Sequence, residues 1–488
     1  MSGHATTSLH HGPPGAARRI DVEPARWRDA AREALDAGLR FSGLFGIEGA
    51  GGVVAAALFG RSGEERLLVC DPGPATIVPS LLGIVPAAEW DEREAHDLYG
   101  ISFSGHEPLR PLVHHSDDLD SWTVEVGGED THQVAVGPIH AGIIEPGHFR
   151  FHVVGERILH LDLRLFYSHR GLERAAEGRE PADALRHAQR ACGACAVANS
   201  VAFAHAWESA GGLWPDAELA RARTTLLELE RLYNHLGDIS AVCAGVGFAP
   251  GTAAFAALKE RALRLNRSLA GHRFLFDSVA VGASRLQVDE SRARRAREEL
   301  RELADESARA WRELRFAGSL QERLAGVGVV SREQALRHGA VGPTARACGV
   351  ARDARSLSPR LAYGDFSPAR PPSPTGDVAA RVDMRGAELE QTLGLLDGLL
   401  GRAIEPARCE PLDSAAPGGD VGVGRIESPR GESVCVVSAH DGRVARMHLR
   451  SASYANWPLV AQAARGELLP EFPLINKSFE LCYACCDR

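Results

Sequence analysis

The sequence predicts an α+β protein: a small N-terminal α/β domain followed by a large, mainly helical bundle domain with peripheral β-strands. Three observations predict this class. Residues 20–115 mix strand-like apolar runs with two short helical segments. Residues 181–314 carry long stretches of helical periodicity. Residues 149–165 and 421–448 alternate between apolar and polar side chains, as strands with one buried face do.

The first domain is expected over residues 20–115, after a polar arm (residues 1–19) whose Gly, Pro and His content is typical of a flexible tail. Apolar runs bounded by turn residues predict strands, and a glycine after a helix with an acidic start predicts the end of that helix. The predicted elements are a helix over 24–38, strands over 52–59 and 66–70, and a helix over 89–99 that ends at Gly100. Residues 116–134 are acidic and lack periodicity, which predicts an inter-domain linker.

The second domain is expected over residues 135–488. Its first strands are predicted within 149–165, with a break at Gly155. Helical periodicity then predicts long helices that bury one another in a bundle, over 181–211, 217–237, 253–275, 291–314 and 381–402. The Pro- and Ser-rich residues 355–376 predict an extended loop, and residues 421–448 predict a β-hairpin.

Charge and hydropathy exclude two classes of protein. The net charge of -9 and the pI of about 6.1 argue against a general nucleic-acid-binding protein, which would present a basic surface. The most apolar stretch, residues 43–60, contains Glu48 and six glycines. It therefore cannot supply the roughly 20 apolar residues of a membrane-spanning helix.

Half of the ten cysteines are clustered in the sequence, which points to metal or redox chemistry in a large chain of this kind. Two Cys-x-x-Cys pairs, Cys192/Cys195 and Cys482/Cys485, are separated by 287 positions, counted from Cys195 to Cys482. The first pair borders an apolar helical run, and a helix N-terminus nearby would favour thiolates. Two such pairs in one chain predict a single site in which four thiolates bind a metal.

The spacing alone leaves the identity of the metal open. A structural zinc ion that fixes the end of the chain to the core fits the donor set. A soft redox metal such as nickel would also be held well by four sulfurs. Zinc ribbons usually join their pairs across a short loop, whereas a long helical segment between the pairs suits a site inside a large core.

Several motifs resemble those of a known family. Residues 92–110 (EREAHDLYGISFSGHEPLR) resemble the signature of the 30 kDa subunit of respiratory complex I. Residues 137–150 (GPIHAGIIEPGHFR), 228–238 (ELERLYNHLGD) and 271–274 (GHRF) resemble the 49 kDa subunit. With both cysteine pairs retained, this fusion resembles the large subunit of group 4 membrane-bound [NiFe] hydrogenases, of the formate hydrogenlyase and hydrogenase-4 type.

The resemblance implies an oxidoreductase that splits and forms H2 heterolytically. It implies that the four thiolates hold a Ni–Fe(CN)2CO centre, with Cys195 and Cys485 bridging both metals and Cys192 and Cys482 terminal on nickel. Glu145 matches a glutamate that relays protons from a terminal thiolate, and Arg430 matches an arginine above the open metal position. Taken alone, Glu145 before Pro146 and the Pro-Arg-Gly triplet around Arg430 would each be read as an exposed turn.

Glu173 matches a glutamate that binds a structural magnesium ion in related large subunits, so Mg2+ is a second candidate cofactor. The histidine that usually completes that magnesium site is replaced by Arg488. An ion pair between Arg488 and a carboxylate is therefore the alternative to a magnesium site.

Three further features, which involve four residues, depart from the family pattern without removing a metal ligand. Glu480-Leu481 stands where Asp-Pro usually precedes the third cysteine, and Asn199 stands where many hydrogenases carry His. Cys486 is an additional thiol, expected not to bind the metal because adjacent cysteines cannot easily point to the same ion.

The resemblance also implies partners. The sequence contains no further cysteine cluster for an iron–sulfur cluster, so the [4Fe–4S] centre is expected in a small subunit like the 20 kDa subunit of complex I. A ferredoxin-like electron-transfer subunit and antiporter-like and ND1-like membrane subunits are expected too. They would hold this chain peripherally on the cytoplasmic side of a membrane. The alternative function is a complex I-like NADH:quinone oxidoreductase subunit that binds quinone and no nickel.

Overall fold

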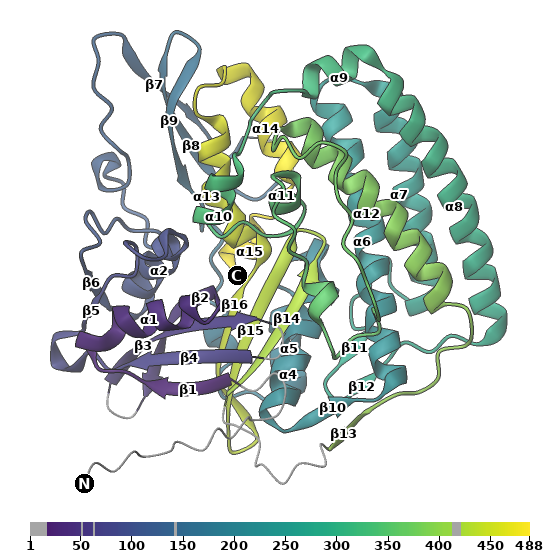
Figure 1. Cartoon of the computed structure of the whole chain (residues 1–488), viewed down its shortest axis with the longest axis horizontal. Helices are drawn as coiled ribbons and strands as arrows, with labels where there is room; N and C mark the ends of the chain where they lie inside the picture. Colours follow the sequence, from purple (N-terminus) through teal and green to yellow (C-terminus); the bar gives the residue numbers. More distant parts are fainter. Residues whose placement is uncertain (1–16, 50–51, 62–63, 141–143, 412–420) are drawn as a thin grey trace.

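The computed structural model describes residues 17–488 apart from 50–51, 62–63, 141–143 and 412–420. It is an α+β protein with a sheet-containing N-terminal part and a largely helical C-terminal part, as predicted (Figure 1). Most of the predicted arm, residues 1–16, lies outside the described residues. Residues 17–19 do not continue the arm, because they open strand β1 (Ala17–Asp21), which pairs in parallel with β4 (Glu64–Cys70).

The N-terminal part is a four-stranded sheet whose two faces are both buried. The strand order is β1-β4-β3-β2, with β2 at Arg40–Gly49 and β3 at Gly52–Arg61. Helix α1 (Trp27–Asp36) covers one face, and strands β14 and β15 of the C-terminal part pack against the other. Burial on both faces explains why β3 reads as a continuous run of apolar residues. Helix α2 (Glu89–Tyr99) ends at Gly100, as predicted, and the short strands β5 (Ile77–Pro79) and β6 (Ser102–Ser104) pair beside it.

A second, antiparallel sheet follows, with order β7-β8-β9. Its strands are β7 (Thr131–Val136), β8 (His148–Val154) and β9 (Arg157–Arg164). The break between β8 and β9 falls at Gly155, as predicted, whereas β7 begins inside the segment expected to be a linker. Helices α13 (Ala452–Ala464) and α14 (Phe472–Phe479) pack on this sheet through Phe149, Phe151 and Trp457.

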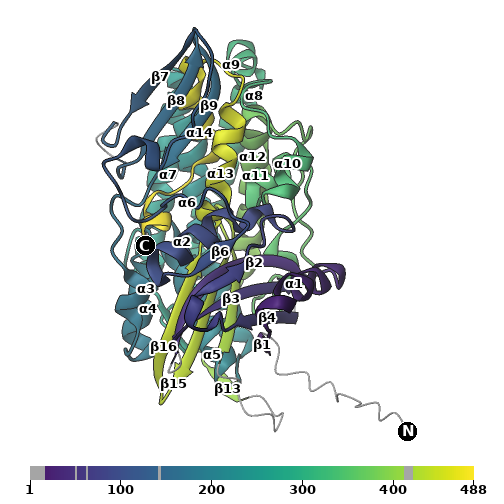
Figure 2. The ribbon, with the colours of Figure 1, turned by 90° about the vertical axis from the view of Figure 1, so that its left-hand side faces the viewer.

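Four long helices lie side by side on one side of the molecule (Figures 1 and 2). They are α6 (Ala217–Gly245), α7 (Ala249–Ala270), α8 (Glu290–Phe316) and α12 (Val378–Leu399). Helix α6 is buried along most of its length because neighbouring helices surround it, as a bundle requires. The shorter elements around them are α3 (Leu172–Ala176), α4 (Pro181–Gln189), α5 (Ala196–Ala210), α9 (Gly318–Leu324), α10 (Arg332–Arg337), α11 (Gly342–Ala347), α15 (Ala484–Asp487), β10 (Leu213–Pro215), β11 (Val279–Ala280), β12 (Ala283–Ser284) and β13 (Cys409–Pro411).

A third sheet lies between the helices and the N-terminal sheet. It has three antiparallel strands, β14 (Val421–Ser428), β15 (Gly431–His440) and β16 (Arg443–Arg450), rather than the predicted hairpin. Helix α5 packs directly on β14. A Cβ atom at Gly422 would stand 1.9 Å from the carbonyl oxygen of Ala206, so only glycine permits this close approach.

One difference from the predicted helices bears on the site. The single helix expected over 181–211 is divided into α4 and α5, and the interruption between them contains Cys192 and Cys195. Among the helices that the structure describes, none combines the length and the apolar character that a membrane span needs.

Candidate metal centre

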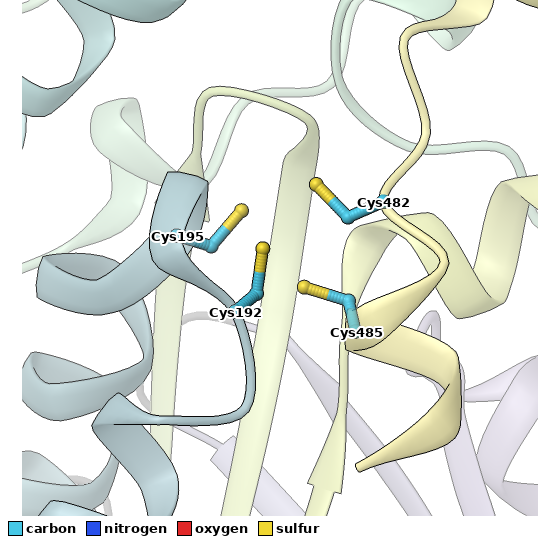
Figure 3. Close-up of side chains that lie close together, drawn as sticks. All are labelled: Cys192, Cys195, Cys482 and Cys485. Carbon is cyan, nitrogen blue, oxygen red and sulfur yellow. The ribbon is translucent and has the colours of Figure 1, made fainter. Parts of the chain in front are cut away.

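The four cysteines of the two Cys-x-x-Cys pairs meet at one point inside the protein. The sulfur atoms of these four residues, Cys192, Cys195, Cys482 and Cys485, all lie within 4.8 Å of one another. Figure 3 shows the two pairs facing each other from the segment before α5 and the segment around α15, with all four sulfurs directed inward. Cys192, Cys195 and Cys485 are buried and Cys482 is half-buried. Residues at opposite ends of a long segment therefore form one four-sulfur site.

The first cysteine pair is held by helix α6. Cys195 is the residue that precedes the first turn of α5, so its sulfur lies at a helix N-terminus. The buried Glu230 of α6 accepts hydrogen bonds from the backbone N–H groups of Val197, at 2.7 Å, and Ala198, at 3.0 Å. Asn234, one turn further along α6, donates to the carbonyl oxygen of Ala194 at 2.9 Å. These bonds fix the start of α5 and the turn that carries both sulfurs.

The second cysteine pair is held by the start of helix α13. The hydroxyl of Ser453 accepts a hydrogen bond from the backbone N–H of Cys482 at 3.0 Å. The hydroxyl of Ser451 donates to the carbonyl oxygen of Cys485 at 3.1 Å. After the pair, the Asp487 carboxylate accepts from the backbone N–H groups of Phe166, at 2.8 Å, and Ser168, at 3.1 Å. The turn is thus attached at both ends to other segments.

Three of the converging thiol groups, those of Cys195, Cys482 and Cys485, have strongly shifted pKa values. Hydrogen bonding from the Cys192, Cys195 and Cys485 thiols holds the pKa of Cys482 well below its usual range. Interactions with Cys192 and Cys482 raise the pKa of Cys195 well above its usual range, and Cys485 shows the same direction. The Cys482 sulfur is thereby favoured as a thiolate, and metal binding would release the protons on Cys195 and Cys485.

Arg430 lies beside the cysteines in the turn between β14 and β15, on the buried side. Its guanidinium pairs with the Asp238 carboxylate and donates to the Asn234 side-chain oxygen at 3.2 Å. Burial alone would lower the pKa of Arg430, but Asp238, Cys482 and Glu480 raise it well above its usual range. The exposed turn that the triplet alone would indicate is therefore not formed, and Arg430 is a fixed cation next to Cys482.

Glu145 is close enough to the turn that carries Cys482 and Cys485 to influence two residues of that turn. It is exposed in this chain, but its charge contributes to the raised pKa values of Tyr483 and Asp487. Burial is the main cause of both shifts, to about 12 for Tyr483 and about 6 for Asp487. These two effects indicate that Glu145 is near the turn that carries Cys482 and Cys485. Residues 141–143 of the predicted motif 137–150 lie outside the described residues.

Glu173 is enclosed by positively charged groups. It pairs with the guanidinium groups of Arg446, at 3.0 Å, and Arg488, at 2.7 Å. His448 lies 3.3 Å from the same carboxylate. The ion pair expected as the alternative to a magnesium site is therefore formed.

The three departures from the family pattern are all close to the cysteines in sequence. Asn199 is fully buried one helical turn after Cys195, and neither atom of its amide has a hydrogen-bond partner among the described residues. The Cys486 thiol lies 3.8 Å from the carbonyl oxygen of Cys482 and is not among the four converging sulfurs. Glu480 adopts a left-handed backbone conformation, and burial and the Asp238 carboxylate raise its pKa to about 8.

Several residues of the site were not predicted from the sequence, among them two buried charged residues of α6. Glu230 and Asp238 lie within the recognised motif 228–238, but on a helix whose charged residues would normally face solvent. The signal that could have identified them is the density of charged residues on a helix predicted to be central in a bundle, because buried charges must be paired.

The donor set is suited to a soft or borderline metal. Four sulfurs at one point bind zinc, nickel or iron well and bind magnesium or calcium poorly. The unpartnered Asn199 amide and the fixed Arg430 cation add polar groups beside the sulfurs. The residues therefore fit a nickel–iron centre as well as they fit a single metal ion.

Comparisons with known proteins identify the relatives of this chain. The family model described as "Respiratory-chain NADH dehydrogenase, 30 Kd subunit" matches residues 20–123. The model described as "Respiratory-chain NADH dehydrogenase, 49 Kd subunit" matches residues 246–411 and 410–488. The solved structure of the membrane-bound sulfane sulfur reductase, an archaeal respiratory membrane complex, contains a chain with a TM-score of 0.67 and 26% identity. That similarity covers 74% of this chain and 99% of the other.

Two proteins of Escherichia coli (strain K12) are similar over most of their length. Formate hydrogenlyase subunit 5 is 31% identical over 446 residues, which cover 84% of this chain and 77% of the relative. Hydrogenase-4 component G is 31% identical over 436 residues, which cover 84% of this chain and 76% of the relative. The chain therefore belongs to the family of group 4 membrane-bound hydrogenase large subunits, oxidoreductase subunits in which regions like the 30 kDa and 49 kDa subunits of complex I are joined.

Proposed function

We propose that this chain is the catalytic large subunit of a membrane-associated [NiFe] hydrogenase that splits and forms H2 reversibly. The single observation that carries the proposal is the convergence of four cysteine sulfurs within 4.8 Å of one another. A quinone-binding subunit of complex I has no need of four thiolates at one point. A structural zinc ion would use them, but it would leave the buried Arg430 beside Cys482 without a role.

Cys192, Cys195, Cys482 and Cys485 would hold the nickel–iron centre. When bound, that centre supplies the two-electron chemistry that cleaves or forms the H–H bond. The protein supplies the fixed geometry. Glu230 and Asn234 restrain the first pair, and Ser451 and Ser453 restrain the second.

Arg430 and Glu145 would have different roles at the four sulfurs. The Arg430 guanidinium, fixed by Asp238, stabilises negative charge that develops at the open side of the site. The Glu145 carboxylate, near Tyr483 and Asp487, accepts or delivers the proton that a thiolate exchanges. Its exposure in this chain suits a group that must pass protons onward.

The electrons would leave through a small subunit that carries a [4Fe–4S] cluster, and a ferredoxin-like subunit would continue the chain of carriers. Antiporter-like and ND1-like membrane subunits would hold this chain peripherally at the cytoplasmic side of a membrane. The alternative function is a complex I-like quinone reductase subunit without nickel. The matches to the 30 kDa and 49 kDa subunits support that alternative, and the retained cysteines argue against it.

Metal analysis of the chain, purified with its partner subunits, tests the proposal together with dye-coupled H2 uptake and evolution. We expect nickel and iron, with nickel in a one-to-one ratio to the chain, and activity in both assays. Zinc in place of nickel, or quinone reduction by a nickel-free preparation, would contradict the proposal. Cys195→Ser should lose both nickel and activity, whereas Cys486→Ser, which alters the adjacent non-converging thiol, should keep both.

A further inference from the structure

A second cluster of side chains of the types that bind metal ions lies close to the turn that carries Cys482 and Cys485. Ligand atoms of Glu94, Glu173 and His448 lie within 4.8 Å of one another, and all three residues are buried. The residues come from three elements: α2, α3 and β16. Two carboxylates and an imidazole in this arrangement could hold a divalent cation.

The guanidinium of Arg488 stands between the two carboxylates of this cluster. Its Nε atom is 2.7 Å from Glu173 and its Nη2 atom is 2.5 Å from Glu94. Its face stacks on the Tyr454 ring, 4.8 Å from the ring centre. Arg488 is 3% exposed, so both ion pairs are shielded from water. The position that a bridging cation would take is therefore taken by a side chain.

The Glu173 carboxylate has its hydrogen-bonding capacity filled. Its Oε1 atom accepts from Arg488 Nε and from the backbone N–H of Leu449, at 2.9 Å. Its Oε2 atom accepts from Arg446 at 3.0 Å, with His448 Nδ1 at 3.3 Å. Although burial works against it, these groups hold the pKa of Glu173 well below its usual range. A metal ion would have to displace one of the two guanidinium groups.

The charges of the cluster are already balanced. Arg446 and Arg488 offset Glu94 and Glu173, so a divalent cation that displaced one guanidinium would leave an uncompensated positive charge in a buried site. Such a charge is strongly disfavoured where little water reaches it. The structure thus disagrees with the magnesium ion that the family resemblance implies.

We propose that Arg488 is a positioning residue whose guanidinium replaces a divalent cation. The Glu94–Glu173–His448 cluster then binds no metal ion and holds the Cys482/Cys485 turn through Arg488. Arg488 lies three residues after Cys485, and its two carboxylate partners lie on different units of the fold. Glu94 belongs to α2 of the N-terminal part, and Glu173 belongs to α3. The guanidinium therefore fixes the Cys482/Cys485 turn to both. This inference is independent of which metal the four sulfurs hold.

Manganese provides the probe, because Mn2+ prefers oxygen and nitrogen ligands to thiolates and its electron paramagnetic resonance signal changes when it binds. We expect the wild-type protein, as purified with its partners, to contain no Mg2+ or Mn2+ that survives gel filtration. When Mn2+ is added to the wild type, we expect the electron paramagnetic resonance signal to remain that of the free ion. The melting temperature of the protein should also stay unchanged. One tightly held Mg2+ or Mn2+ per chain in the wild type would overturn the proposal without any variant.

Arg488→His should convert the cluster into a cation site. The variant restores a fourth ligand and removes the competing guanidinium, and Glu94 Oε2 has no hydrogen-bond partner among the described residues. We expect it to bind one Mn2+ per chain and to regain stability on Mn2+ addition, after a loss of about 5 °C or more in melting temperature without metal. Arg465→His, at an exposed arginine, is the matched control and should behave as the wild type does.

Arg488→Lys extends the test if the histidine variant is poorly folded. The ammonium keeps the charge but cannot span both carboxylates, so stability should fall partly and Mn2+ should still be excluded. Histidine and lysine variants that melt at the wild-type temperature, with no gain of Mn2+ binding, would show that Arg488 does not hold this turn.

Discussion

Gly424 on β14 lies so close to Ala202 on α5 that a Cβ atom at position 424 would stand 1.8 Å from the Ala202 carbonyl oxygen. The contact fixes the distance between the helix that begins at Cys195 and the strand that leads to Arg430. Two parts of the candidate site are therefore set by the packing of one helix on one strand.

Gly424→Ala is expected to destabilise the protein and disturb the site. The added methyl group must push α5 away from β14, at a cost of about 2–3 kcal/mol, and Cys195 should move with the helix. Unfolding in urea and nickel content measure both effects. Gly394→Ala is the matched control, because no atom lies within 4 Å of its Cβ position on α12. That change should stabilise the protein by up to about 1 kcal/mol, and equal behaviour of the two variants would contradict the expected contact.

Glu230→Gln is expected to flatten the pH dependence of stability. Burial raises the pKa of Glu230 to about 8, although the N–H groups of Val197 and Ala198 favour the carboxylate. Because this folded-state pKa lies above the ordinary value of 4.5, the group contributes stability below that value that is lost as the pH rises through 8. The free energy of unfolding should fall in this window by up to about 1.4 kcal/mol per pH unit from this group.

Urea unfolding of the metal-free protein at a series of pH values measures this slope. Glu322→Gln, at an exposed glutamate on α9, should keep the wild-type slope. If Glu230→Gln keeps it too, Glu230 is ionised throughout the range and the raised pKa is wrong.

Arg430→Lys is expected to lower H2 activity per nickel by about tenfold to hundredfold while nickel content stays the same. Lysine keeps the positive charge but cannot hold Asp238 and Asn234 together. Arg385→Lys is a strict control, because Arg385 also pairs with Asp238, at 3.0 Å. That variant should lose stability but keep its activity per nickel, and a similar activity loss in both would assign the effect to Asp238 rather than to Arg430.

Glu145→Gln is expected to slow proton transfer by about a hundredfold or more with no change in bound metal. The amide has the shape of the carboxyl group but cannot exchange a proton. Hydrogen–deuterium exchange between H2 and heavy water follows this step directly. Glu156→Gln, in the exposed turn between β8 and β9, should be unchanged, and full exchange activity in Glu145→Gln would remove Glu145 from the proton path.

The sequence was most informative where long-period patterns dominate. The four long bundle helices and the N-terminal strands β3 and β4 lie where periodicity and apolar runs predict them. Strand β1 was missed because only its pairing with β4, and no apolar pattern of its own, makes it a strand. The third strand β16 was missed because alternating side chains look the same in a hairpin and in a three-stranded sheet.

The site shows the same division. Cysteine spacing predicts four converging sulfurs, since few other arrangements use two Cys-x-x-Cys pairs. It does not predict that Glu230 caps α5, because the partners lie on different helices and local periodicity carries no information about tertiary pairing. The sequence likewise did not identify which carboxylates pair with Arg488, because Glu94 is separated from Arg488 by most of the chain.

Because the two cysteine pairs are far apart in the sequence, a bound metal would stabilise the folded protein by restricting the unfolded chain. A metal held by all four sulfurs would close a loop of 287 positions between Cys195 and Cys482. By the chain-entropy relation for cross-links, a metal that stays bound during unfolding would raise the free energy of the unfolded state by roughly 5–6 kcal/mol at 25 °C for a loop of that length. Loss of the metal would therefore lower the free energy of unfolding of the whole domain between the two pairs.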